Sequence, residues 1–167
     1  RAVHETGRGN GNGFARSPYH ARPSVPRSAR SRVGAPGLMP HAKIEVRRHR
    51  PAHEVQALIE AVYEAQRAAL KVPESDRHIR YVEYLPEHFA VPPGRSENFT
   101  LVEILLFPGR SPEAKRRLYE EIVARFEALG IAPLDVTIVL LEPPLENWGI
   151  RGGVPASDIA LGFDLQV

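Results

Sequence analysis

The chain has 167 residues, which is enough for one globular domain and short of what two ordinary domains need. Its 43% hydrophobic and 25% charged residues are typical of a folded domain and exclude a wholly disordered protein. The absence of cysteine excludes disulfide scaffolds, thiolate metal sites and cysteine nucleophiles, and it fits a cytoplasmic location. No stretch approaches roughly 18 uninterrupted apolar residues, so we expect no membrane span and no membrane partner.

The net charge of +2 hides an uneven distribution of charge along the chain. Residues 1–38 contain seven Arg and one acidic residue and carry +6, whereas the other 15 basic and 19 acidic residues give −4. A mildly acidic domain argues against nucleic acid as a partner of the folded part. An Arg-rich arm that binds nucleic acid is the alternative for the first segment.

The first 38 residues do not have the composition of a folded segment. They contain six Gly, four Pro and four Ser, and their apolar residues follow no period. Such a segment cannot bury enough apolar surface to offset the entropy of its chain, so we predict a disordered Arg/Gly/Pro-rich extension over 1–38. The only methionine is Met39, and we expect the true start to lie there, with the domain spanning 39–167. A transit peptide would have a similar composition.

From Met39 onward the sequence repeats one pattern twice. Alternating apolar residues predict strands, and apolar residues spaced three or four apart predict helices. Ser111-Pro112 is a typical helix start, and Gly130 is a typical end. In chain order we predict a strand at 42–46, a helix after Pro51, a strand at 79–85, a strand at 100–107, a helix from 112 to about 129 and a strand at 136–141.

This order predicts an α+β fold with the plan β-α-β-β-α-β. Right-handed crossovers place both helices on one face of a four-stranded sheet. The strands at 100–107 and 136–141 are apolar on both faces, so we expect a second subunit to cover the other face in a homo-oligomer. The glycines and prolines of 142–153 predict a loop or short hairpin, and 159–165 has the pattern of an edge strand.

Conventional catalytic and metal-binding motifs are missing from the sequence. His49 and His53 are four residues apart, but Pro51 lies between them at a helix start, which disfavours a metal pair. His41, His78 and His88 show no ligand spacing either, and we expect no metal and no cofactor.

Met39-Pro40 directly before the first strand is the unusual feature. Removal of an initiator methionine would expose the secondary amine of Pro40. An α-amino group has a pKa of roughly 8, and burial or nearby cations lower it, which yields a base suited to proton abstraction beside a carbonyl. The alternative is that Pro40 is a linker proline, whose nitrogen is an amide.

Several motifs in this order resemble the tautomerase superfamily. They are Met-Pro before a strand, the repeated β-α-β unit, Val-Pro-Glu-Ser-Asp-Arg at 72–77, Phe-Pro-Gly-Arg-Ser at 107–111 and Glu-Asn-Trp at 146–148. The similar branch is the long-chain, 4-oxalocrotonate tautomerase-like one that includes malonate semialdehyde decarboxylase. The resemblance covers 39–167, and it implies a tautomerase-like fold, a homotrimer and cofactor-independent catalysis.

The resemblance also implies roles for individual residues. Pro40 matches the catalytic N-terminal proline, Asp76 an aspartate that assists the proline or a water, and Arg110 the arginine that binds a substrate carboxylate. Trp148 and Ile150 fall where the family places an apolar wall over the pocket. The family's decarboxylases have a second arginine near the one matched by Arg110, and this chain has Phe-Pro-Gly at 107–109 instead.

Each of these residues also has a structural interpretation. Asp76 could cap a turn, Arg110 could be solvated at the helix entrance, and Trp148 could serve subunit packing. Arg151 could reach a substrate carboxylate or a neighbouring subunit. Glu103, in an apolar strand, could be a site group or a cross-strand partner.

Together these features favour a tautomerase that acts on enol or dienol carboxylic acids, with Pro40 as general base. A decarboxylase of a small β-keto acid such as malonate semialdehyde is one alternative, in which the prolyl amine would act protonated. A non-catalytic oligomeric interaction module is another, and it predicts no effect of Pro40→Ala.

Overall fold

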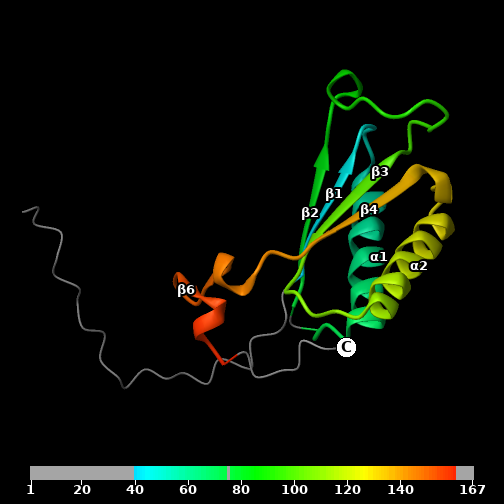
Figure 1. The fold of residues 1–167 in the computed structure, drawn as a ribbon. Coiled ribbons are helices and arrows are strands. Elements are labelled where there is room, and N and C mark those ends of the chain that lie inside the picture. Colours follow the sequence, from blue (N-terminus) through cyan, green and yellow to red (C-terminus); the bar gives the residue numbers. More distant parts are fainter. Residues whose placement is uncertain (1–39, 75, 161–167) are drawn as a thin grey trace, which may run out of the picture. The chain divides into compact units, whose positions relative to one another are not determined.

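The computed structural model describes residues 40–74 and 76–160, and it contains both predicted β-α-β halves (Figure 1). The elements are β1 (His41–Val46), α1 (Ala52–Leu70), β2 (His78–Glu83), β3 (Thr100–Leu105), α2 (Pro112–Ala128), β4 (Val136–Leu141), β5 (Gly149–Ile150) and β6 (Val154–Pro155). The four long strands form one sheet in the order β2-β1-β3-β4. Strand β1 is parallel to β2 and antiparallel to β3, and β3 is parallel to β4. The predicted α+β architecture is confirmed, whereas the predicted extension at 1–38 and Met39 lie outside the described residues.

Both helices begin at residues that the sequence marks. Helix α1 starts directly after Pro51, and Lys71 ends it in the left-handed conformation with φ 55°. Helix α2 starts behind Ser111, whose Oγ accepts a hydrogen bond from the N–H of Ala114 at 3.1 Å. Gly130, with φ 82°, then turns the chain toward β4.

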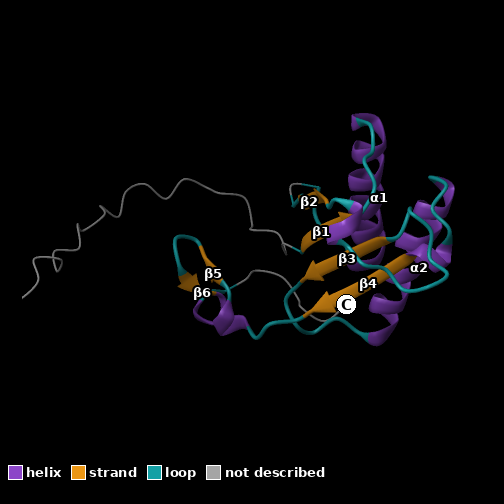
Figure 2. Cartoon of the chain, turned by 90° about the horizontal axis from the view of Figure 1, so that it is seen from above, coloured by secondary structure: helices purple, strands orange, loops and turns teal. Residues whose placement is uncertain are grey.

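The two helices cover the same face of the sheet, as predicted (Figure 2). Their apolar sides meet alternate residues of the strands, so one continuous core forms between the two layers. Its members that are at most 1% exposed include Ile44, Val46, Leu58, Val62, Val102, Ile104, Leu118, Ile122 and Phe126.

The other face of the sheet is not covered by these helices. On β1 and β3 it is charged, because Lys43 Nζ lies 3.1 Å from Glu45 Oε2 and 2.6 Å from Glu103 Oε2. On β4 it is apolar, and Val139 and Leu141 are 38% and 41% exposed. The expectation of a second cover therefore applies to the β4 side of this face, whereas an ion-pair cluster interrupts the apolar pattern at its centre.

Two strands differ at their ends from the prediction. Strand β3 ends at Leu105 rather than 107, and the following Phe107 packs against residues of the C-terminal part of the chain. Strand β2 covers 78–83 rather than 79–85. The N–H of Tyr84 still donates to the carbonyl oxygen of Val46 at 2.8 Å, but Pro86 then begins a 3₁₀ turn and ends the extended chain.

The C-terminal segment, residues 142–160, forms the predicted short hairpin. Strand β5 pairs with β6 in the antiparallel sense. Arg151, Gly152 and Gly153 make the turn with φ values of 47°, 85° and 93°. Residues 159 and 160 are not part of a strand, and the rest of the predicted edge strand lies outside the described residues.

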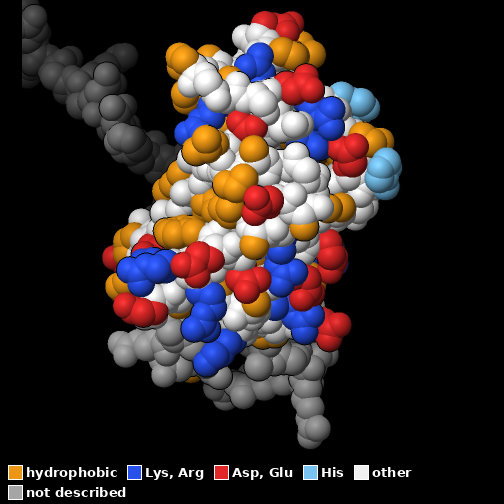
Figure 3. Space-filling model, turned by 90° about the vertical axis from the view of Figure 1, so that its right-hand side faces the viewer, with side chains coloured by type: hydrophobic (Ala, Val, Ile, Leu, Met, Phe, Trp, Pro, Cys, Tyr) orange, Lys and Arg blue, Asp and Glu red, His pale blue; other side chains and the backbone are white. Residues whose placement is uncertain are grey.

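The outer surface on the side of α2 carries acidic and basic side chains of both signs, interspersed with hydrophobic ones (Figure 3). This mixture is typical of a helix face in contact with water. Among the described residues, neither helix combines the length and the apolar character that crossing a bilayer requires.

Candidate active site

The sheet brings Pro40, Asp76 and Arg110 to the same end of the molecule. His41 at the start of β1 pairs with His78 at the start of the parallel strand β2. The residues that precede the two strands, Pro40 and Asp76 among them, therefore lie at the same end of the sheet. His41 also pairs with Leu105 at the end of the antiparallel strand β3, after which the chain continues to Arg110. All three predicted residues are buried. We call this region the Pro40 end of the sheet.

Asp76 is a buried carboxyl group in the turn that leads into β2. Its side chain is 6% exposed, and Oδ2 has no hydrogen-bond partner among the described residues. The turn is made by its backbone, whose N–H donates to the Pro73 carbonyl at 3.0 Å. Burial raises the pKa of Asp76, and His78 acts in the opposite direction. This carboxyl group therefore holds its proton to a higher pH than an exposed aspartate does.

Arg110 lies between β3 and α2, immediately before the Ser111 cap. Gly109, with φ 118°, gives the loop a conformation that other residues rarely adopt and leads the chain into Arg110. The Arg110 side chain is only 5% exposed, in contrast to a solvated residue at a helix entrance. A buried guanidinium group at this position offers planar, two-point recognition to a carboxylate.

Trp148 lies in a small apolar cluster beside the Pro40 end. Its ring packs edge-on against Phe107, with centroids 4.9 Å apart and planes at 85°, and stacks on His41 at 5.9 Å and 18°. Ile150 belongs to the same cluster, and Ala156 is 1% exposed within it. Trp148 is thus packed within its own chain, which gives it a role that needs no subunit interface.

Two further candidate residues are not members of this apolar cluster. Arg151 is exposed at the β5–β6 turn. Glu103 lies opposite Lys43 in the β1–β3 register and forms the 2.6 Å ion pair with it, which supports the interpretation as a cross-strand partner.

The sequence analysis missed His41 and His78 as neighbours at the Pro40 end. Their ring centroids are 5.0 Å apart. The available signal was that His41 directly follows Pro40, but its contact with His78 depends on the strand register, which local spacing does not reveal. In the described part of the chain no group of three or more His, Cys, Asp or Glu residues could hold a metal ion.

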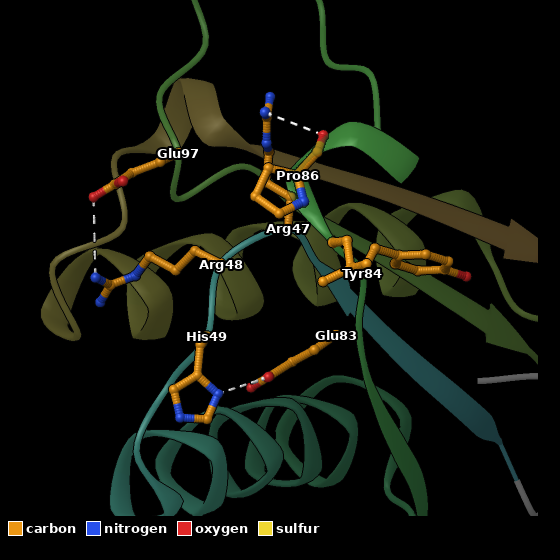
Figure 4. Close-up of a pocket in the computed structure, with 8 residues that line it drawn as sticks. Arg47, Arg48, His49, Glu83, Tyr84, Pro86 and Glu97 are labelled. Carbon is orange, nitrogen blue, oxygen red and sulfur yellow. Dashed lines mark hydrogen bonds and ion pairs between the residues drawn. The ribbon is translucent and has the colours of Figure 1, made fainter.

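A cavity of 630 Å³ lies at the opposite end of the sheet, where β1 and β2 finish (Figure 4). Its basic side chains already have acceptors, because His49 Nδ1 lies 2.9 Å from Glu83 Oε2 and Arg47 donates to the Pro86 carbonyl at 3.3 Å. The predicted site residues do not line it. Its walls consist of Arg47, Arg48, His49, Glu83, Tyr84, Leu85, Pro86 and Glu97.

Comparison with known proteins agrees with the fold and the motifs. Residues 76–151 match the family model described as tautomerase enzyme. A malonate semialdehyde decarboxylase, solved in wild-type, mutant and inactivated forms, is 25% identical with a TM-score of 0.64, and the alignment covers 72% of this chain and 99% of that one.

Two further structures share the fold at lower identity. The malonate semialdehyde decarboxylase FG41, inhibited by 3-bromopropiolate, is 23% identical over 72% of this chain and 98% of its own, with a TM-score of 0.63. A native fused 4-OT is 17% identical over 71% and 98%, with a TM-score of 0.65. These comparisons show that the chain has a tautomerase-like fold and that residues 76–151 are similar to the tautomerase enzyme family.

Proposed function

We propose that this chain is a cofactor-independent tautomerase that uses the secondary amine of an N-terminal Pro40 as general base on small enol or dienol carboxylic acids. The observation that carries the proposal is the convergence of Pro40, Asp76 and Arg110, all buried, at one end of the sheet. The match of residues 76–151 to the tautomerase enzyme family and the similarity to a malonate semialdehyde decarboxylase support an enzyme with this kind of chemistry.

In the proposed reaction the neutral amine of Pro40 removes the proton of the enol hydroxyl group. The O–H electron pair forms the carbonyl group, and the carbon–carbon double bond takes a proton back from the protonated amine at its far carbon. Arg110 holds the substrate carboxylate and stabilises the negative charge that develops on the enolate. Asp76 orients a water molecule or the substrate.

Trp148 and Ile150 serve the proposed reaction as an apolar wall. A wall that excludes water strengthens the charge interactions of Arg110 and disfavours the charged form of the prolyl amine. Both effects favour a neutral base at physiological pH. In this scheme Arg151 assists carboxylate binding from the exposed turn.

A decarboxylase of a small β-keto acid is the second candidate, favoured by the 25% identity to a malonate semialdehyde decarboxylase. In that reaction the bond to the carboxyl carbon breaks, CO₂ leaves and the electron pair forms an enolate. The protonated Pro40 amine stabilises the enolate and protonates its carbon. A decarboxylase needs the cationic amine and loses activity as pH rises, whereas a tautomerase needs the neutral amine and loses activity as pH falls.

We further propose a homotrimer that works in the cytoplasm. Fused 4-OT structures include symmetric and asymmetric trimers, and the half-exposed Val139 and Leu141 on the open sheet face support burial between subunits. Sedimentation of the purified protein measures the assembly. A trimer without activity in any assay would favour the non-catalytic interaction module.

The mass of the intact protein from its native host is the decisive first measurement. A mass that corresponds to residues 40–167 exposes the amine, and assays with enol acids should then show activity that Pro40→Ala lowers by about 10²–10⁴-fold, the usual contribution of a general base. A mass that retains 1–39 would make the Pro40 nitrogen an amide. In that case the catalytic proposal is wrong.

A further inference from the structure

The ring contacts of Trp148 connect the C-terminal segment to the Pro40 end of the sheet. Trp148 stacks on His41 of β1, and His41 in turn lies against His78 of β2, with centroids 5.0 Å apart and planes at 58°. Trp148 also makes an edge-on contact with Phe107, which follows β3. Trp148 of the C-terminal segment thus contacts the first residue of β1 and a residue that follows β3.

The polar groups of Trp148, in contrast, are bonded within the C-terminal segment itself. Its Nε1–H donates to the Pro143 carbonyl at 3.1 Å, and its own carbonyl accepts from the N–H of Ala156 at 2.9 Å. These hydrogen bonds fix the hairpin relative to Trp148, so a displacement of the indole ring moves the C-terminal segment with it. The contact of Trp148 with His41 therefore contributes to the packing of the C-terminal segment against the sheet.

The surroundings of His41 favour its neutral form. His78 and Arg80 approach it from β2, and together with burial, which is the largest effect, they lower the pKa of His41 below the ordinary value of 6.5. Farther along the same face, the ammonium group of Lys43 lies 2.6 Å from Glu103 Oε2. The turn before β2 contributes the buried carboxyl of Asp76 on the side of His78.

We propose that His41 is a positioning residue whose neutral imidazole holds Trp148, and with it the C-terminal segment, over the Pro40 end, and whose protonation weakens this hold. The catalytic consequence rests on the proposed function, because Trp148 forms the wall of that site. The structural part, a proton-linked contact between His41 and Trp148, does not depend on catalysis.

The sign of the pH dependence follows from linkage. We call the state in which Trp148 stacks on His41 closed and the state in which the His41 imidazole is solvated open. The closed state binds a proton at His41 more weakly than the open state does. The stacked contact is therefore fully favoured above pH 6.5 and is progressively lost as the pH falls below that value toward the lowered pKa of His41. One proton is involved, so the equilibrium between closed and open changes by at most about tenfold per pH unit.

Fluorescence tests the contact directly, because Trp148 is the only tryptophan of the chain. In the full chain we expect its emission to shift to longer wavelength, and quenching by acrylamide to increase, as the pH falls from 8 to 4.5. Far-UV circular dichroism should stay constant over this range. In His41→Phe, which keeps a ring without a titrating group, the transition should disappear and the emission should stay at the short wavelength.

Two further variants serve as controls for this test. His41→Gln removes both ring and charge and should give the red-shifted, quenchable emission at every pH. His88→Phe changes an exposed histidine of the β2–β3 connection and should leave the transition unchanged. A transition of equal midpoint in His41→Phe, or no transition in the native chain, would overturn the inference.

Activity provides a second, separable readout. If the proposed function holds, His41→Gln should raise KM more than it lowers kcat, and His41→Phe should remove the low-pH rise of KM. A protein that is inactive with all enol and keto acids but shows the fluorescence transition would refute the function and support the contact. An active protein without the transition would refute the contact alone.

Discussion

The two ends of the sheet are built from equivalent positions of the two β-α-β halves, yet their buried aspartates differ in the hydrogen bonds that they accept from the described residues. Asp76 precedes β2 at the Pro40 end, and Asp135 precedes β4 at the opposite end. The two carboxyl groups are 6% and 4% exposed. Asp135 accepts hydrogen bonds from the N–H and the Oγ of Ser96, at 2.8 and 2.5 Å, whereas Oδ2 of Asp76 accepts none from the described residues.

The opposite end of the sheet also has counterparts of Arg110 and Pro40. Arg50, which precedes α1 as Arg110 precedes α2, donates to Glu54 Oε2 at 3.0 Å and to Asn98 Oδ1 at 3.3 Å. The position before β3 that corresponds to Pro40 holds Phe99, which is 7% exposed and packs against a neighbouring aromatic ring. One backbone plan therefore places the candidate site at one end of the sheet and the hydrogen-bonded side chains of Arg50 and Asp135 at the other.

Replacing the two arginines should give the largest difference between the ends. Arg110→Ala should lower kcat/KM by about 10²–10³-fold, because it removes the group that stabilises the developing enolate. Arg50→Ala, the matched control, should leave kcat/KM within about twofold and destabilise the fold by about 1–3 kcal/mol, because Glu54 and Asn98 lose a buried donor. Steady-state kinetics and urea unfolding measure the two effects. Equal losses of activity in both variants would remove the functional distinction between the ends.

The two aspartates should respond oppositely in stability. Asp135→Asn should destabilise the protein by about 1–3 kcal/mol, because both carboxylate oxygens of Asp135 accept a hydrogen bond from Ser96 and the amide nitrogen of asparagine cannot accept one. Asp76→Asn should be neutral or stabilising at pH 7, because it removes a buried charge whose Oδ2 has no hydrogen-bond partner among the described residues. Chemical denaturation at pH 7 measures both. A clear loss of stability in Asp76→Asn would show that the Asp76 carboxylate is a structural group.

The same pair also predicts the direction of the pH dependence. Hydrogen bonds from Ser96 lower the pKa of Asp135, so its stabilising contribution is present above pH 3.8 and is lost as the pH falls through the lowered value. The pKa of Asp76 is raised, so its effect on folding is most favourable below 3.8 and declines as the pH rises through the raised value. Thermal unfolding between pH 3 and 7 should therefore show a shallower pH slope for Asp135→Asn and a steeper one for Asp76→Asn. The reverse order of slopes would contradict both assignments.

Local sequence signals predicted the elements because each one has a local cause. The four-residue spacing of Ala114, Leu118, Ile122 and Phe126 and the Ser111 cap determine α2, and all four spaced residues are buried as expected. The burial of Asp76 and Arg110 at one end depends on strand order, which two equal β-α-β units do not specify by themselves. Family resemblance, rather than periodicity, directed attention to these two residues.

The parts that local patterns did not reveal arise from contacts between distant segments. His41 meets His78 and Trp148 only after the register of β1 and the path of the C-terminal segment are established. The bonds of Asp135 with Ser96 likewise join residues 39 positions apart. Such long-range contacts distinguish the two equivalent ends of the sheet, so sequence reasoning found the candidate residues but not the contacts that make the ends different.

The smallest expected effect concerns Glu103, whose position left two interpretations open. It lies between the two ends in the middle of β3, paired with the half-buried Lys43. Because a partly exposed ion pair contributes little, Glu103→Gln should cost about 0.2–1 kcal/mol of stability and leave kcat/KM unchanged. A double-mutant cycle with Lys43→Met should return a coupling of that size. If Glu103→Gln instead lowered kcat/KM tenfold with unchanged stability, the site would extend along the open face and the comparison between the two ends would need a third region.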